Sequence, residues 1–254
     1  MTKSRKTRGF WKILGLVILM SFLLSLFFTV LFRWVNPPVT PLMVIRKAQY
    51  GHPIEQKWRP IEDISPNLYK AAIASEDNFF LGHRGFDVIA IDQAVRERET
   101  RGRKRGASTI SQQTAKNVFL WPGRSWVRKG LEVYYTFLIE TFWGKERIME
   151  VYLNVIETGP GIYGAEAAAQ HYFHCGARQL SPHQAALITA CYPAPLRRDP
   201  AHPSAYVSRQ ASVIQDRMAR YGNPRFTDEY AKACRKRYKE AVKRWEKKKK
   251  ASHS

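Results

Sequence analysis

The chain has 254 residues, of which 42 are Lys or Arg and 21 are Asp or Glu, so its formal charge is +21. This length allows one or two domains with a substantial core, and a hydrophobic content of 44% is ordinary for a folded protein. The excess of basic residues favours a polyanionic partner, namely nucleic acid, an anionic membrane or a phosphorylated ligand. The odd number and the spacing of Cys175, Cys191 and Cys234 argue against a disulfide framework and a structural zinc site.

The N-terminal segment combines basic residues with a long apolar run. The run ILGLVILMSFLLSLFFTVLF, residues 13–32, contains no charged residue and follows the basic residues Lys3, Arg5, Lys6, Arg8 and Lys12. Its length matches the ~20 residues of a bilayer-spanning helix. We therefore expect a cytoplasmic tail over 1–12, a transmembrane helix over 13–35 and export of the rest. A buried core helix and a cleaved signal peptide are the alternatives.

The remaining chain reads as a series of helices. NPPVTP at 36–41 predicts a stiff linker, and the stretch after it, to about residue 62, is mixed. Ser65-Pro66 and Ser181-Pro182 are typical of helix starts. Helical spacing predicts helices over 66–78, 86–98, 109–119, 126–142, 145–156, 163–173, 181–191, 204–220 and 227–246. RETRGRKRGAS at 98–108 predicts a mobile basic loop, and KRWEKKKK at 243–250 a solvated tail. The exported part should be mainly α.

IASEDNFFLGHRG, residues 73–85, places two carboxylates side by side. Acids beside large apolar groups are costly to keep ionised unless a partner compensates the charge. From the pattern alone, Glu76 and Asp77 are either a catalytic acid pair in a cleft or loop acids that cap a helix.

GASTISQQTAKN, residues 106–117, is the second polar stretch. Its small residues let backbone N–H groups approach an anion. The helix that follows would carry two glutamines, a lysine and an asparagine on adjacent turns. This composition suits a polar ligand, and it equally suits a capped, exposed helix.

Four motifs in this order resemble those of the peptidoglycan glycosyltransferase family, glycosyltransferase family 51. They are EDNFFLGHRG at 76–85, GASTISQQTAKN at 106–117, RKGLEVYYTFLIE at 128–140 and KERIMEVYLNVIETGPGIYG at 145–164. Thr136 stands where the family usually has alanine, and Cys191-Tyr192-Pro193 where it often has Leu-Pro. The resemblance implies a lysozyme-like helical transglycosylase domain with a smaller jaw lobe, preceded by one transmembrane helix. We expect this domain over 59–225, after a linker and the start of the periplasmic part at 36–58, with a basic helix and tail over 226–254.

The resemblance also implies a reaction. Such an enzyme polymerises lipid II into β-1,4 glycan strands with inversion and releases polyprenyl diphosphate. No S-x-x-K or K-T-G string occurs, so we expect a monofunctional enzyme without transpeptidase activity, anchored in the inner membrane with a cytoplasmic N-terminus and a periplasmic catalytic domain. Expected partners are lipid II, the growing glycan, inner-membrane lipids and cell-wall synthesis or division proteins. A glycan hydrolase and a membrane-tethered nucleic-acid binder are the rival hypotheses; export of the basic domain argues against nucleic acid.

Residue roles carry over by motif position. Glu76 matches the catalytic base, Glu132 the second essential carboxylate, and Lys116 with Arg124 and Arg128 the pyrophosphate contacts. Glu132 would act through a divalent ion, Mg²⁺ or Mn²⁺, or by orienting Lys116 and Arg124; no organic cofactor is expected.

The remaining predicted site residues are Asp77, His83, Ser108, Thr109, Gln112, Gln113 and Asn117. The last five match sugar and phosphate contacts of the family. Asp77 is expected to orient its loop, and His83 is either a structural histidine or a proton carrier. Glu150 and Asn154 are expected to brace helices, and Phe80 to help to keep water from the acceptor.

Overall fold

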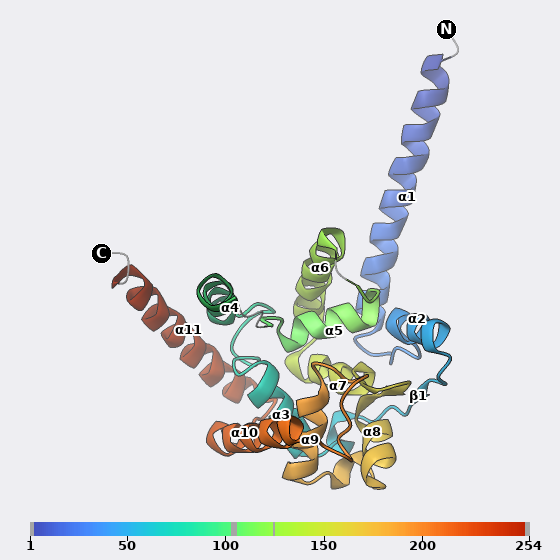
Figure 1. Ribbon diagram of the computed structural model, residues 1–254. Helices are drawn as coiled ribbons and strands as arrows, with labels where there is room; N and C mark the ends of the chain where they lie inside the picture. The colour runs from blue at the N-terminus through green and yellow to red at the C-terminus, as the bar shows by residue number, and fades with distance from the viewer. Residues whose placement is uncertain (1–2, 103–105, 124, 252–254) are drawn as a thin grey trace.

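The computed structural model describes residues 3–102, 106–123 and 125–251, without the side chains of residues 3–8 and 101 (Figure 1). The helices are α1 Lys3–Leu31, α2 Pro41–Tyr50, α3 Pro66–Glu76, α4 Val88–Arg101, α5 Ile110–Phe119, α6 Trp126–Phe142, α7 Lys145–Val155, α8 Gly164–Phe173, α9 Pro182–Cys191, α10 Ala205–Tyr221 and α11 Asp228–Ala251. The strands are β1 Glu55–Gln56, β2 Glu157–Gly159 and β3 Ile162–Tyr163. The predicted mainly α fold is confirmed.

Most predicted helices begin and end within a few residues of their predicted limits, but two expectations were wrong. The mixed stretch after the proline-rich linker holds α2, where Thr40 caps the helix by accepting a bond from the Met43 N–H at 3.4 Å. The expected tail is exposed for the most part, but the expected helix end at 246 was wrong, because α11 continues to Ala251. Residues 103–105 of the expected basic loop lie outside the described residues, and its first residues belong to α4.

The core lies where α3, α9 and α10 pack together and where α5 and α8 pack against α7, in the lower part of the molecule in Figure 1. Tyr152 of α7, Leu68 of α3 and Phe80 in the loop after α3 are fully buried there. A small sheet in the order β1-β3-β2 closes one side, with β1 parallel to β3 and β2 antiparallel to it. This body holds the C-terminal end of α3 rigidly, and α3 ends at Glu76.

The apolar helix α1 leaves this body as a long rod (Figure 1). Residues 9–31 are long and apolar enough to cross a membrane and are almost wholly exposed. The lower end of α1 is packed against α6: Ser25 Oγ lies 2.8 Å from the Tyr134 hydroxyl, and Trp143 Nε1 donates to the Thr29 carbonyl at 2.7 Å. The Arg147 guanidinium then donates to the Phe32 carbonyl at 3.0–3.1 Å. The contacts fix the helix to the domain.

Candidate active site

Glu76 lies at the end of α3, where its carboxylate meets α5. Gln113 Nε2 donates to Glu76 Oε2 at 2.9 Å, and Ser75 Oγ lies 3.5 Å from Oε1. Burial raises the pKa of Glu76; the hydrogen bonds from Gln113 and Ser75 and the charge of Lys116 pull the pKa down, while the charge of Asp77 adds to the rise. A carboxylate with a raised pKa is a stronger base and is suited to removing a proton.

Asp77 faces away from this carboxylate and is buried. Its Oδ1 lies 2.8 Å from His83 Nε2, and its Oδ2 accepts the Ile110 N–H at 3.0 Å. Ile110 is the first residue of α5, so an anion here also complements the positive end of that helix. The adjacent acids thus have separate environments: Asp77 ties α3, its following loop and α5 together, whereas Glu76 points towards Gln113.

The polar residues at the start of α5 divide into two groups. Thr109 and Gln112 are buried and form a capping box: the Gln112 N–H donates to Thr109 Oγ1 at 3.2 Å, and the Thr109 N–H donates to Gln112 Oε1 at 3.0 Å. Thr109 Oγ1 also donates to the Gly85 carbonyl at 2.6 Å, which joins the helix start to the loop after Glu76. Ser108 is exposed and Gln113 half-buried, so these two side chains can meet a ligand.

Lys116 lies one turn after Gln113 on α5, and the negative charges of three carboxylates act on its ammonium group. Desolvation lowers the pKa of Lys116, and the charges of Glu132, Glu157 and Glu76 raise it in part. The structure thereby brings the two carboxylates predicted from the motifs into the field of one cation. Asn117, the next residue, is buried in the same helix.

Glu132 is a buried carboxylate whose two oxygens both face cations of its own helix, α6. Arg128 donates to Oε2 at 3.0 Å, and Lys129 Nζ lies 2.5 Å from Oε1. Arg128 Nε is buried and makes no hydrogen bond among the described residues, so part of this guanidinium is available to a further acceptor. Arg124, predicted beside this cluster, lies outside the described residues.

The donor set around Glu132 does not fit a divalent cation. Both carboxylate oxygens already bond to cations, and the described residues contain no group of three or more His, Cys, Asp or Glu side chains that could hold a metal ion. Mg²⁺ requires oxygen ligands in near-octahedral order. Glu132 bonds Arg128 and Lys129, whereas the predicted partners differ: Glu132 acts on Lys116 only through its charge, and Arg124 lies outside the described residues.

Three residues of this region were not singled out from the sequence. Lys129 neighbours Glu132 in sequence, and Tyr152 donates to Gln113 Oε1 at 3.4 Å from α7. Glu157 is buried in β2, where burial raises its pKa and the charges of Arg46 and Lys116 oppose the rise. The only signal for Glu157 was an acid placed directly before a glycine-rich turn.

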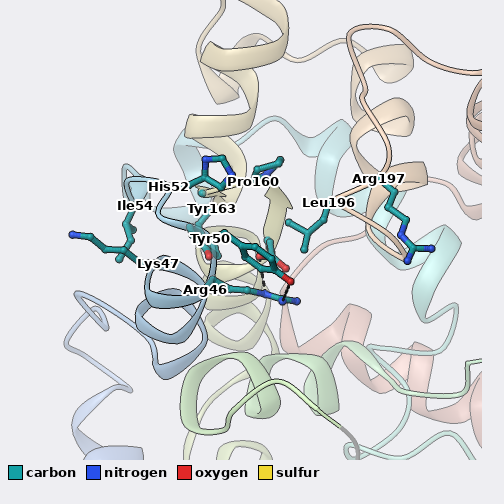
Figure 2. A pocket seen from close by; sticks show the side chains of 11 residues that line it. Arg46, Lys47, Tyr50, His52, Ile54, Pro160, Tyr163, Leu196 and Arg197 are labelled. Atoms are coloured by element: carbon teal, nitrogen blue, oxygen red, sulfur yellow. Dashed lines mark hydrogen bonds and ion pairs between the residues drawn. The ribbon is translucent and has the colours of Figure 1, made fainter.

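A cavity of about 340 Å³ is lined by residues of α2 and by Glu157 of β2, and Figure 2 shows its α2 side chains. Arg46 Nε lies 3.2 Å from Glu157 Oε1, and the guanidinium of Arg46 lies over the Tyr50 ring at 5.5 Å. Figure 2 shows Arg46 and Tyr50 in the middle of the lining, with His52 and Leu196 further out. Glu157 therefore connects this basic cavity electrostatically to Lys116.

Two further expectations can be compared with the structure. The side chain of the fully buried Asn154 bonds the N–H and the carbonyl of Arg59, each at 2.8 Å, and Glu150 accepts the Ile61 N–H at 3.1 Å. The two residues therefore brace α7 against the segment before α3, and not one site helix against another. The idea that Phe80 shields the acceptor was wrong. Its ring is fully buried in the core, 4.5 Å beneath the Lys145 ammonium.

Comparison with known proteins places these motifs in a family. The family model described as "Transglycosylase" matches residues 43–219. A "Biosynthetic peptidoglycan transglycosylase" of Bdellovibrio bacteriovorus is 53% identical over 207 residues, which cover 80% of this chain and 83% of the relative. Proteins of the same name from Caulobacter vibrioides and Bacteroides thetaiotaomicron are 55% and 57% identical, each over 73% of this chain and over 80% and 77% of the relatives.

Proposed function

Because this chain belongs to the transglycosylase family, we propose that it polymerises lipid II into β-1,4 glycan strands and releases polyprenyl diphosphate. The observation that carries the proposal is that α5 contacts two unlike sites through Gln113 and Lys116. One is a carboxylate with a raised pKa, Glu76, held by Gln113; the other is a cation cluster formed by Lys116 and the α6 residues bound to Glu132. Inversion by a single displacement requires a base for the attacking hydroxyl and positive charge for the departing diphosphate.

Glu76 acts on the acceptor sugar as the general base. Its carboxylate takes the proton from the sugar hydroxyl while that oxygen attacks the anomeric carbon of the donor. The amide of Gln113 fixes one carboxylate oxygen and leaves the other, near Ser75, for the hydroxyl. General-base catalysis of this kind contributes ~10²–10⁴-fold to the rate.

Cationic side chains stabilise the departing diphosphate. Lys116 and Arg128 carry the charge that stabilises the departing diphosphate, and an arginine suits phosphate oxygens because of its planar fork. Glu132 holds Arg128 and Lys129 in place and does not itself approach the diphosphate. No step of this scheme passes through a metal ion.

The substrate side chains fall into two classes. Ser108, whose side chain is exposed, is the residue that we assign to sugar and phosphate contact. Gln113 acts instead through its bond to Glu76, and Asn117 is buried. Asp77 and His83 are bonded to each other in the interior, and Thr109 and Gln112 are occupied as the α5 cap. We therefore assign these four to positioning of the site.

The membrane placement follows from the contact between α1 and α6. We propose that α1 spans the inner membrane once, with the N-terminus in the cytoplasm and the domain in the periplasm. Tyr134 of α6 meets Ser25, which lies six residues before Leu31 and so roughly 9 Å into the span at 1.5 Å per residue. Trp126 and Phe137 of α6 are 93% and 64% exposed. The site therefore lies at the level where a lipid-linked substrate presents its diphosphate.

The test is polymerisation of lipid II by the purified full chain carrying Glu76→Gln. We expect the rate to fall by ~10²–10⁴-fold, because the amide cannot accept the proton. Glu229→Gln, at an exposed glutamate of α11, is the matched control and should retain the wild-type rate. Persistence of polymerisation in Glu76→Gln would refute the assignment of the base. Cut glycan without polymer from the wild-type chain would refute the transferase and support a hydrolase.

A further inference from the structure

Helix α11 lies beyond the family match, which ends at residue 219. It contains eleven Lys or Arg residues against four Asp or Glu. The charges are not evenly distributed: Asp228 and Glu229 stand in its first turn, and Lys247–Lys250 in its last. This order complements the helix dipole, and it concentrates positive charge at the C-terminal end.

One face of α11 is packed against the loop that follows Glu76. Cys234 is buried, and Tyr238 lies one turn later on the same side. The Tyr238 ring lies 5.2 Å from the ring of Phe79 and 5.8 Å from that of His83. A Cβ atom at Gly82 would come within 2.8 Å of the Tyr238 Cβ, so the glycine permits this close approach.

The same face continues along α4. The Tyr238 hydroxyl accepts the Val88 N–H at 3.0 Å, at the first turn of α4. Two turns later Trp245 Nε1 donates to Asp92 Oδ2 at 2.9 Å, and Lys249 Nζ lies 3.1 Å from Oδ1. These bonds explain why the C-terminal segment is helical, and they join α11 and α4 into one unit.

The other faces of α11 are exposed and basic. They carry Lys232, Arg235, Lys236, Lys239, Lys243, Arg244, Lys247 and Lys248. Figure 1 shows that the C-terminal end of α11 rises towards the side of the body from which α1 leaves. Val88, Ile91 and Val95 form an exposed apolar stripe along α4, at helical spacing on one face. Positive charge beside an apolar stripe is the pattern of a surface that binds anionic lipid.

We infer that α11 docks on the anionic phospholipid surface of the bilayer that α1 spans, as a second attachment of the domain. The charge of the helix, its direction and the neighbouring apolar stripe all favour this occupant. The inner face of α11 packs against Phe79, His83 and α4. Attachment of the C-terminal end of α11 to the membrane therefore holds the loop after Glu76 on the membrane side of the site. The inference rests on the membrane placement of α1 proposed above.

The test is lysine acetylation of the full chain in vesicles, read by mass spectrometry. In vesicles with about one third phosphatidylglycerol, labelling at Lys243, Lys247 and Lys248 should be several-fold lower than in pure phosphatidylcholine, and high salt should restore it. Lys57, on the strand side of the body, is the internal control and should label equally in both. Equal labelling of the α11 lysines in both vesicles would overturn the inference.

Matched variants separate the possible failures. Replacing Lys243, Lys247 and Lys248 by glutamine should weaken attachment by roughly fivefold per lysine. The labelling of the remaining exposed Lys232, Lys236 and Lys239 should then rise towards its level in pure phosphatidylcholine. The control removes three exposed arginines of α10, Arg209, Arg217 and Arg220, and should change nothing. Protection of the α11 lysines by an acidic polymer but not by vesicles would also overturn the inference. Loss of the whole chain from vesicles after a high-salt wash would refute the placement of α1 instead.

Discussion

The bond between Gln113 and Glu76 permits a sharp test of how the base is tuned. Gln113→Met keeps the approximate volume of the side chain and removes its amide donor. A hydrogen bond to a charged group contributes ~1.5–3 kcal/mol, and we take the low end because Gln113 is half-buried. Loss of the Gln113 hydrogen bond raises the pKa of Glu76 further. The acid limb of the pH–rate profile should therefore move to higher pH. At a pH on that limb the rate should fall roughly tenfold, and on the plateau it should stay within about twofold.

The assay is the initial rate of lipid II polymerisation over about pH 5 to 9. Ser75→Ala is the matched control, since Ser75 Oγ lies 3.5 Å from the other oxygen and forms a much weaker bond. It should shift the profile far less. If Gln113→Met lowered the rate by the same factor at every pH, the amide would act as a substrate contact and not through Glu76. The reasoning from the raised pKa of Glu76 would then fail.

Four further results are expected. Asp77→Ala leaves His83 Nε2 and the Ile110 N–H without an acceptor in the interior and should lower the free energy of unfolding by about 2–6 kcal/mol in denaturant titration; a loss below about 1 kcal/mol would contradict the positioning role. Thr109→Ala should lower that free energy by ~1 kcal/mol with KM for lipid II unchanged, whereas a raised KM would indicate sugar contact. Burial lowers the pKa of Lys116, so the wild-type rate should decline at high pH as the ammonium loses its proton; Lys116→Arg should abolish this decline, and its persistence would place the basic limb on another group. Excess EDTA should leave the wild-type rate within about twofold, and a larger loss would restore the metal hypothesis for Glu132.

The sequence predicts helices well wherever the start signal is local. Ser65 before Pro66 and Ser181 before Pro182 both cap helices in the structure. The same rule failed for α2, because its cap Thr40 stands inside a proline-rich stretch that reads as a linker. The end of α11 could not be found from local pattern, since Trp245 and Lys249 are held there by Asp92, a residue far away in sequence.

The sequence names candidate site residues, but it does not specify the contacts that those residues make. The motifs name Glu76, Lys116 and Glu132. In the structure both carboxylates lie close enough to Lys116 for their charges to affect its pKa. The division of labour between the adjacent acids depends on the position of α5, which no local pattern specifies. Glu157 was missed for the same reason, because it meets Lys116 only after β2 has folded against the helices.

The contact of α1 with α6 means that anchor and enzyme tilt and rotate in the bilayer as one piece. Trp143 and Arg147 occupy the carbonyl groups at the end of α1, and Ser25 meets Tyr134 above them. A flexible tether would let the domain take any orientation, whereas the contact between α1 and α6 fixes one orientation of the domain relative to the membrane plane. The nascent polymer should therefore emerge at a constant angle to the lipid surface, and the packing of two helices, not the chemistry, determines that angle.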